Sequence, residues 1–482
     1  MYDYVVIGAG IIGSCIAREL SKYNVKALVL EKENDVANVQ TLANSAIIHS
    51  GHNPEPGSLK ARLSVWGNQL YEEMEHELSI PLLRTGAYVV AHNKEEEDKL
   101  DELVETSKLN QVPEFEILDF KDAVKTEPNL STTTSKVLSL PTTKVTYPWE
   151  VAFACMENAI LNGIEFQKNA EVTKLIKDND VFTVTINGKD IVHTKAVINA
   201  TGVNVDDISG MVESHVEYKI KPRRGEYFVL DKRVVGFVNH VLYPLPTELG
   251  KGVLLTPQVH GNILVGPDSK VVEDKHRTDN TFAGLEYVKK NAGALADNIP
   301  FHQIIRSFAG IRASIDQEDF IIKESDEVSD FFHVAGIDSP GLTAAPAIAK
   351  YLLHNIIKIK DKFQTNEAFN PIRYKPAEFH TLTFAEQQAL VKENPMYGSM
   401  ICKCELITEK EVVDAINGPL GSDTIKGIKK RTRAGAGLCQ GGYCEEKVLK
   451  LIAREKHISL LEVKYDTNYS NLFVSETKVV KK

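Results

Sequence analysis

The sequence contains no run of about 18 apolar residues, the length that a helix needs to cross a bilayer, so we expect no transmembrane segment. Positive charge is not in excess either, and the net charge of −10 argues against a general nucleic-acid-binding protein. No internal repeat and no low-complexity tract is visible. The first expected strand begins at Tyr4, which leaves no room for a signal peptide. We therefore expect a cytoplasmic protein, or one in peripheral contact with a membrane, that binds no nucleic acid.

Cysteine is scarce as well. The chain has six cysteines in 482 residues, and four of them lie between positions 402 and 444. In a cytosolic chain such clustering indicates a metal site and not disulfides. Cys15 and Cys155 stand apart from the others and are expected to be small core residues. Because 482 residues are too many for one hydrophobic core, we expect two or three domains.

A glycine-rich turn follows the first apolar strand, Tyr4–Ile7. Its glycines at positions 8, 10 and 13 form the pattern GxGxxG, and a helical pattern follows them. In this pattern Gly8 allows a tight turn, Gly10 lets the backbone approach a pyrophosphate, and Gly13 lets helix and strand pack closely. The N-terminus of the helix offers N–H groups and a positive dipole end to the phosphates.

The residues after this helix complete a dinucleotide-binding unit. Val25–Leu30 is typical of a second strand, and Glu31 stands at its end, where a carboxylate can accept the ribose hydroxyls of adenosine. A GxGxxG pattern alone is a weak signal. The strand, helix, second strand and acidic residue in order make a dinucleotide site the favoured interpretation over a chance glycine-rich turn.

Residues 38–51 are small and polar at first, then apolar, with His49 near the end. Small residues let a backbone lie against a flat ring system. One interpretation places His49 beside the isoalloxazine ring of a flavin. The alternative is an ordinary buried or turn histidine, and local sequence alone favours this alternative.

Further apolar runs outline two sheets. Lys195–Asn199 and Phe331–Ala335 are expected to be buried strands of the first domain, so this domain is discontinuous and returns near residue 330. Strand-like runs between residues 220 and 266, together with Tyr88–Val90, predict a mostly antiparallel second sheet on the substrate side. The segment from Lys358 to about Asn394 is charged and polar, and we expect a connector over the surface.

The clustered cysteines form a C-x-C…C-x₄-C set. Four thiolates suit either a tetrahedral zinc ion or an iron–sulfur cluster. A C-x-C pair is tighter than the pairs of most structural zinc sites and suits a cluster of two irons, while four cysteines without a metal remain the third alternative. Basic residues between 429 and 433 could offset the charge of four thiolates, and nearby glycines let backbone N–H groups approach the sulfurs.

Several of these stretches resemble the D-amino-acid-oxidase-type flavoproteins, and within them the glycerol-3-phosphate dehydrogenase and oxidase branch. The resemblance covers about residues 1–360 and is carried by GAGIIG (8–13), TLANSAIIHSG (41–51), PRRGEYFVLDK (222–232), GKGVLLTPQVHGNILVGPD (250–268), FAGIRAS (308–314) and GIDSPGLTAAPAIAKYL (336–352). The stretch KKRTRAGAGLCQGGYC (429–444) resembles the bacterioferritin-associated-ferredoxin-type 2Fe–2S domain.

The resemblance implies an α/β fold with a Rossmann-like FAD-binding domain, an antiparallel-sheet substrate domain and a small helical C-terminal domain that holds the cysteines. It places the discontinuous FAD-binding domain at 1–85, 150–215 and 330–360, and the substrate domain at 86–149 and 216–329. A connector at 361–396, a 2Fe–2S domain at 397–455 and a tail at 456–482 complete the chain.

The resemblance also implies which residues bind the cofactors. Non-covalent FAD would contact Gly8, Gly10, Gly13, Glu31, Thr41, Ala43, Asn44, Ser45, Val172, Gly202, Gly336, Gly341, Leu342 and Thr343. A 2Fe–2S cluster, with zinc as the alternative, would be held by Cys402, Cys404, Cys439 and Cys444.

Oxidation of sn-glycerol 3-phosphate to dihydroxyacetone phosphate is the implied reaction. His49 would take the C2-hydroxyl proton while hydride moves to flavin N5, and Arg312 and Lys251 would bind the substrate anion. Structural salt bridges are the alternative for both cations. Electrons would leave through the 2Fe–2S cluster to a protein or quinone-linked partner, or to oxygen. The remaining alternatives are L-2-hydroxyglutarate oxidation, an amine or imino-acid oxidase, and a non-catalytic electron-transfer flavoprotein.

Overall fold

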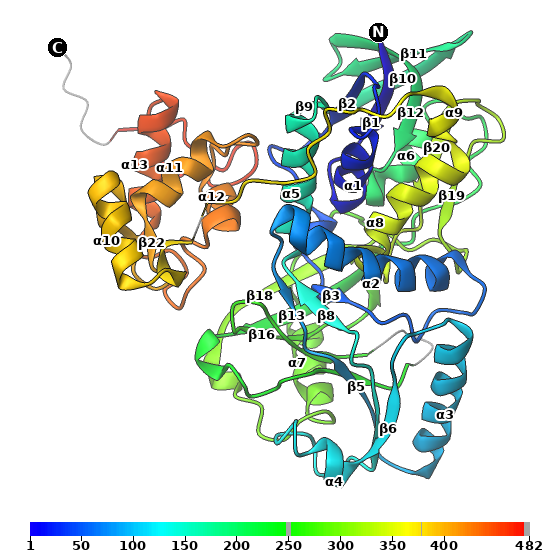
Figure 1. Ribbon diagram of the computed structural model, residues 1–482, viewed down its shortest axis with the longest axis vertical. Helices are drawn as coiled ribbons and strands as arrows, with labels where there is room; N and C mark the ends of the chain where they lie inside the picture. The colour runs from blue at the N-terminus through cyan, green and yellow to red at the C-terminus, as the bar shows by residue number, and fades with distance from the viewer. Residues whose placement is uncertain (247–251, 377, 477–482) are drawn as a thin grey trace. The chain divides into compact units, whose positions relative to one another are not determined.

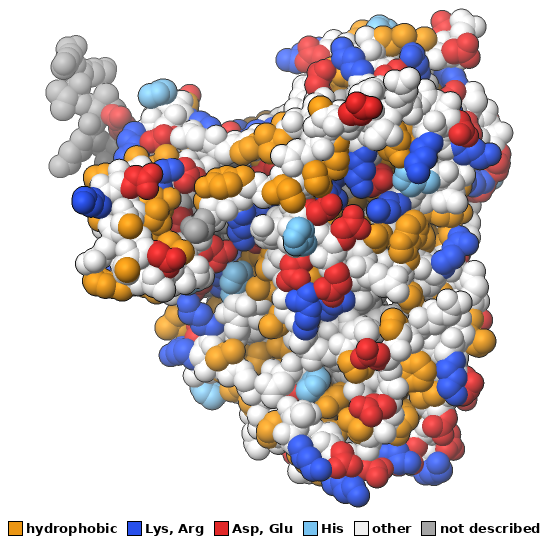
Figure 2. All heavy atoms as spheres, viewed as in Figure 1, with side chains coloured by type: hydrophobic (Ala, Val, Ile, Leu, Met, Phe, Trp, Pro, Cys, Tyr) orange, Lys and Arg blue, Asp and Glu red, His pale blue; other side chains and the backbone are white. Residues whose placement is uncertain are grey.

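The computed structural model describes residues 1–246, 252–376 and 378–476. The chain divides into two compact units (Figure 1). The first consists of Met1–Lys32 and Val36–Ile372, and the second of Glu33–Asp35 and Arg373–Lys482. On the face drawn in Figure 2, Lys and Arg are interspersed with Asp and Glu and do not gather in one basic area, in keeping with the net charge of −10.

The first sheet has eight strands and contains the glycine-rich turn. Its parallel strands are β9 (Glu165–Gln167), β2 (Ala27–Leu30), β1 (Tyr2–Ile7), β12 (Asp190–Asn199) and β20 (Phe331–Ala335), in this order. The antiparallel strands β10 (Val172–Asp178), β11 (Val181–Ile186) and β19 (Ile321–Glu324) extend it. β2 and β20 are buried along their whole length, which explains their unbroken apolar sequences.

Helices cover this sheet. α1 (Ile11–Leu20) packs on α5 (Pro148–Leu161) and on α8 (Gly341–Tyr351), and α8 continues as a π-helical stretch, Leu352–Ile356. α2 (Leu59–Leu78) packs on α8 and lies between the two large sheets of this unit (Figure 1). The short helix α6 (Val205–Ser209) packs against β12 and β20, and α9 (Ile359–Lys362) packs against the π-helical stretch.

The second sheet has nine strands and is antiparallel except where β14 pairs with β5. Its order is β17 (Lys270–Val271), β13 (Arg223–Leu230), β16 (Ile263–Gly266), β15 (Leu254–Pro257), β14 (Val241–Pro244), β5 (Ala87–Ala91), β7 (Lys136–Ser139) and β6 (Glu116–Asp119), with β18 (Ile304–Arg312) paired to β13. The helices α3 (Lys94–Leu109), α4 (Phe120–Ala123) and α7 (Phe282–Ala292) pack against it. The mostly antiparallel second sheet predicted from the sequence is therefore confirmed.

A small three-stranded sheet contributes the histidine segment. It consists of β3 (Ile47–Ile48), β8 (Lys144–Thr146) and β4 (Leu82–Leu83), all antiparallel to their neighbours. His49 follows β3 directly. The fold class, α/β with an antiparallel second sheet and a small helical C-terminal region, is thus the expected one.

The second unit is a small helical body. It contains α10 (Phe384–Glu393), the hairpin β21 (Met400–Cys402) and β22 (Ile407–Thr408), α11 (Glu409–Asn417), α12 (Ile425–Thr432) and α13 (Glu445–Lys456). Val412, Ile428 and Ile452 are fully buried in its core. The segment expected to be a plain connector differs at α10, where Thr383 and Glu386 form a capping box. Part of the expected tail is also packed, since Val463 belongs to the same core.

Candidate active site and metal centre

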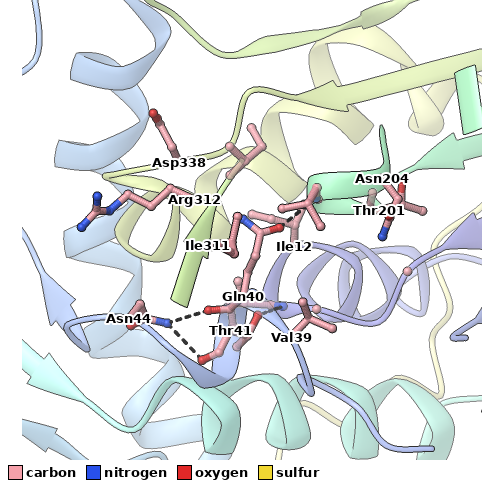
Figure 3. A pocket seen from close by; sticks show the side chains of 18 of the residues that line it. Ile12, Val39, Gln40, Thr41, Asn44, Thr201, Asn204, Ile311, Arg312 and Asp338 are labelled. Carbon is pink, nitrogen blue, oxygen red and sulfur yellow. Dashed lines mark hydrogen bonds between the residues drawn. The ribbon is translucent and has the colours of Figure 1, made fainter. Parts of the chain in front are cut away.

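A cavity of about 320 Å³ lies at the carboxyl ends of the parallel strands β1, β2, β12 and β20. Open parallel sheets bind ligands at this edge. Figure 3 shows Arg312 and Asp338 on one side of the pocket and Thr201 and Asn204 on the other. The predicted residues that line it are Gly8, Gly10, Glu31, Thr41, Ala43, Asn44, Ser45, His49, Val172, Gly202, Arg312, Gly341 and Leu342.

Three of the residues predicted for this site do not belong to its lining, and the placement of a fourth is not described. Gly13, Gly336 and Thr343 are close to the wall but are not among the lining residues. Lys251 lies outside the described residues. Gly336 has a φ of +68°, and a Cβ there would be 2.5 Å from Ile315 Cδ1, so a glycine is needed to form the turn after β20.

Two positions of the β1–α1 turn require glycine for steric reasons. Gly8 has a φ of +100°, and a Cβ on it would lie 2.6 Å from the carbonyl oxygen of Ala200. A Cβ on Gly13 would lie 1.9 Å from the carbonyl oxygen of Gly8. The turn and the close helix–strand packing therefore both require glycine. Gly10 lines the cavity, where the lack of a side chain leaves room for a ligand.

Glu31 connects the end of β2 with this turn. Its Oε2 accepts a hydrogen bond from the N–H of Ala9 at 2.7 Å, and the side chain is buried while it lines the cavity. Thr41 has a similar role on the opposite side, because its Oγ1 accepts from the N–H of Ile11 at 2.9 Å. Both side chains hold the start of α1 against the cavity.

The segment from Gln40 to Ser45 forms a tight, small-residue wall. Asn44 Nδ2 donates to the backbone oxygens of Gln40 and Thr41, at 3.3 and 3.0 Å (Figure 3). Gly310 of β18 approaches this wall so closely that a Cβ on it would lie 2.1 Å from the Ala43 oxygen. This wall therefore presents backbone and small side chains to the cavity, and its contact with a flat ring system stays a prediction.

Gln40 and Gly310 were missed by the sequence analysis. Gln40 Oε1 accepts from the N–H of Val203 at 3.0 Å, and a Cβ on Gly202 would lie 2.0 Å from this oxygen. Gly202 therefore lies close to the Gln40 side chain, and it also lines the cavity. No local signal marks Gln40, because its partner lies 163 positions away.

His49 is fixed on three sides. Its N–H donates to Thr343 Oγ1 at 2.9 Å, and its carbonyl oxygen accepts from Asn68 Nδ2 at 3.0 Å. Its ring Nδ1 lies 2.9 Å from the hydroxyl of Tyr243 in β14. Burial raises the pKa of Tyr243 well above its usual value, so the phenol stays protonated. His49 is buried and lines the cavity, which is where the flavin-side interpretation places it, and its role as a base stays a prediction.

Arg312 is the last residue of β18 and lines the same cavity. Its guanidinium donates to the backbone oxygen of Asp268 at 3.2 Å and to Ser269 Oγ at 3.3 Å. Gly225, on the neighbouring strand β13, leaves room for it, since a Cβ there would lie 2.6 Å from Arg312 Nη2. Both acceptors are uncharged, so these two contacts are hydrogen bonds and not a structural salt bridge.

The four clustered cysteines meet as two pairs in the second unit. Cys404 Sγ lies 3.7 Å from Cys439 Sγ, and Cys402 is hydrogen-bonded to Cys444. This bond, together with backbone N–H groups of Gly435, Glu405 and Cys404, lowers the pKa of Cys402 to about 5. A Cβ on Gly437 would lie 2.6 Å from Cys404 Cβ, so the backbone closely approaches this pair.

The donor set fits a four-thiolate group in number and chemistry. Among the described residues, no three His, Cys, Asp or Glu side chains stand in a metal-binding arrangement. The two remaining cysteines, Cys15 and Cys155, are buried with their sulfurs 3.9 Å apart in the first unit, as expected of core residues.

Two protein families match the chain. Residues 3–354 match the family described as FAD dependent oxidoreductase, and residues 400–454 match the BFD-like 2Fe-2S binding domain. Within the described residues, none of the helices is both long and apolar enough to span a bilayer.

Individual proteins are also similar to the chain. A glycerol 3-phosphate dehydrogenase of Caloramator mitchellensis is 41% identical over 478 residues, which is 99% of either chain. A glycerol 3-phosphate oxidase of Mycoplasma genitalium is 32% identical and covers 76% of this chain and 98% of its own length. The structure of dithionite-reduced L-alpha-glycerophosphate oxidase from Mycoplasma pneumoniae with FAD bound has a TM-score of 0.74 and 27% identity, and covers 78% of this chain and 99% of its own.

Proposed function

The chain belongs to the FAD dependent oxidoreductase family, and from this premise we infer that it oxidises sn-glycerol 3-phosphate to dihydroxyacetone phosphate. The observation that carries this inference is that His49 and Arg312, 263 positions apart in the sequence, line the cavity formed by the glycine-rich turn. A base and a guanidinium in one cavity are what an anionic 2-hydroxy substrate requires.

Three residues of the chain would bind the substrate or take its proton. Arg312 binds the phosphate, because a planar guanidinium can grip two phosphate oxygens at once. His49 lies in the same cavity and takes the proton of the C2 hydroxyl. Lys251, outside the described residues, is proposed as a second anion contact. Bound FAD supplies the hydride acceptor.

The proposed FAD contacts follow the lining of the cavity. Gly8, Gly10 and Glu31 would meet the ADP half, with Val172 on the adenine side, while Ala43, Asn44 and Ser45 would run beneath the flavin ring. The N-terminus of α8 at Gly341 and Leu342 faces the cavity, and its N–H groups can stabilise negative charge on a ring system. Gly13, Gly336 and Thr343 would act by shaping the wall.

The second unit would pass electrons from the flavin to an acceptor. A 2Fe–2S cluster on Cys402, Cys404, Cys439 and Cys444 supplies one-electron transfer. We propose an acceptor protein or a quinone-linked partner as the recipient, with oxygen as the other route. A cytoplasmic location, or a peripheral one at a membrane surface, stays a prediction.

Anaerobic bleaching of the purified yellow protein tests the proposed function. Glycerol 3-phosphate should bleach the flavin absorbance, whereas L-2-hydroxyglutarate, glycine and glycerol should not do so at equal concentration. Heating should release FAD. Faster bleaching by L-2-hydroxyglutarate would make a carboxylate the substrate anion, and equal bleaching by glycerol would contradict an anion site.

A further inference from the structure

His49 has little freedom to move within the cavity wall. Thr343 and Asn68 hold its backbone N–H and carbonyl, so the ring can adjust mainly by rotation about its own side-chain bonds. The contact between Nδ1 and the Tyr243 hydroxyl, at 2.9 Å, fixes this rotation. The orientation of the base thus depends on a residue of the substrate-side sheet, 194 positions away.

Tyr243 stands behind His49 as seen from the cavity. Within the part of the chain that the structure describes, the cavity lining includes His49 but not Tyr243. The tyrosine is 2% exposed, and its ring packs near His49 and His52, with ring centroids 5.9 and 5.7 Å apart. In this arrangement Tyr243 contacts His49 and does not itself line the cavity.

The direction of this hydrogen bond decides what His49 can do. A phenol can donate or accept, and a neutral imidazole carries its proton on one nitrogen only. If Tyr243 donates to Nδ1, the ring proton is on Nε2, and Nε2 cannot accept another. If the phenol oxygen accepts from Nδ1–H, the lone pair is on Nε2, and the ring is a base there. Only the second arrangement suits proton removal.

We propose that Tyr243 is a positioning residue that holds His49 in the Nδ1-protonated form and stabilises the imidazolium once Nε2 has taken the C2-hydroxyl proton. This inference rests on the proposed function of His49 as the base. In the balanced step the O–H proton goes to Nε2, the C2–O bond becomes a carbonyl, and the hydride leaves C2 for the acceptor that the activity already uses.

An uncharged partner suits the surroundings of His49. Arg312 lines the same cavity, and Lys144 donates to Asn68 Oδ1 at 2.7 Å, although Glu72 lies 3.0 Å from Lys144. His52 is the other titratable ring nearby. A carboxylate behind His49 would favour the protonated ring before substrate binds, whereas an uncharged phenol adds no such charge and can still accept a hydrogen bond from the imidazolium.

The test is Tyr243→Phe in the holoenzyme, followed by anaerobic stopped-flow reduction with glycerol 3-phosphate. The limiting rate should fall roughly 10–100-fold, less than the ~10²–10⁴-fold expected when the base itself is lost. The Kd of the substrate should stay within about twofold, because Tyr243 does not line the cavity. Without an acceptor the imidazolium is less stable, so the pKa of His49 falls, and the rise of the rate with pH should shift to lower pH.

The chain contains a matched control. Tyr218 is also buried, and its hydroxyl lies 2.8 Å from Nδ1 of His333, which does not line the cavity in the described structure. Tyr218→Phe removes the same kind of phenol–imidazole bond. It should leave the limiting rate and the pH profile of flavin reduction unchanged, which separates positioning of the base from a general loss of stability.

A companion His49→Gln variant tests the proposed role of His49 as the base separately from the proposed role of Tyr243. A slow His49→Gln enzyme with a fast Tyr243→Phe enzyme would overturn the role of Tyr243 alone, whereas a fast His49→Gln enzyme would overturn both proposals.

If Tyr243→Phe does not fold, ¹⁵N spectra of histidine-labelled, unmutated holoenzyme give the answer. The His49 signals, assigned by their loss in His49→Gln, should show Nδ1 protonated and Nε2 unprotonated. The opposite tautomer would overturn the proposal.

Discussion

The guanidinium of Arg312 is held in place because it donates to the Asp268 oxygen and to Ser269 Oγ. If Arg312 binds the substrate anion as proposed, these contacts would pre-organise its planar fork and lower the entropy lost on binding. A lysine at this position would keep the charge but lose the fork.

We expect Arg312→Lys to raise the Kd of glycerol 3-phosphate roughly 10–100-fold, in line with the loss of a charge-assisted bidentate hydrogen bond. The limiting rate of flavin reduction should change less. Stopped-flow reduction at several substrate concentrations separates the two effects. An unchanged Kd would remove Arg312 from the anion site.

Gly225 offers an indirect version of the same experiment. A Cβ at Gly225 would lie 2.6 Å from Arg312 Nη2, so Gly225→Ala should displace the guanidinium and weaken substrate binding while Arg312 is kept. Gly293→Ala is the control, because the nearest atom to a Cβ there is 3.7 Å away. Equal Kd values in the two variants would show that the position of the guanidinium does not matter.

At the scale of single residues, the sequence indicated His49 and Arg312 as candidate site residues. It did not indicate the residues that hold these two side chains in place. Tyr243, Gln40 and Gly225 act on partners far away in the chain, and such contacts arise only once the sheets are formed. Their own neighbourhoods carry no motif. Lys251, also predicted, lies outside the described residues and stays a prediction.

At the scale of elements, the packing of α2 on α8 supports both His49 and the first turn of α8, which contains Thr343. A Cβ on Gly67 of α2 would lie 2.1 Å from the carbonyl oxygen of Thr343, whose hydroxyl accepts from His49. The two helices can approach this closely only because position 67 is a glycine.

We expect Gly67→Ala to destabilise the protein by about 1–3 kcal/mol, the usual cost of overpacking, despite the gain of about 1 kcal/mol in helix propensity. The melting temperature should fall, and FAD should be released more easily on dilution. Calorimetry and flavin fluorescence measure the two effects. A melting temperature equal to that of the unmutated protein would mean that α2 and α8 separate without loss.

Regular elements were predicted best where the periodicity is strong. β20 has the predicted bounds, β5 contains the predicted run Tyr88–Val90, and the GxGxxG turn joins β1 to α1 as expected. α10 was missed because its segment is charged and has no buried residue, although the Thr383 and Glu386 capping box was a readable signal. The parallel pairing of β14 with β5 could not be read from either strand, since it depends on the whole sheet.

At the scale of the whole molecule, the chain combines two kinds of redox centre. The first unit contains the flavin-type cavity, and the second contains the cysteine pairs. A flavin collects two electrons from the substrate, whereas a 2Fe–2S cluster carries one at a time. The pairing suits a step from two-electron oxidation to a one-electron acceptor, with peroxide formation as a side path.

Replacing Cys439 and Cys444 with Ser tests whether the cluster is needed for electron transfer to the acceptor but not for oxidation of the substrate. Substrate oxidation does not use the cluster in this scheme, so anaerobic bleaching by glycerol 3-phosphate should be preserved, whereas electron transfer to a ferredoxin-like or quinone-linked acceptor should be lost. Cys15→Ser is the control, because it removes a thiol of the first unit and should leave transfer intact. Unmutated protein prepared anaerobically should contain about two irons per chain, as a 2Fe–2S centre requires, and show a paramagnetic signal when reduced. Stoichiometric zinc without iron in that preparation would make the second unit structural, and oxygen would then become the acceptor that the chain is built to use.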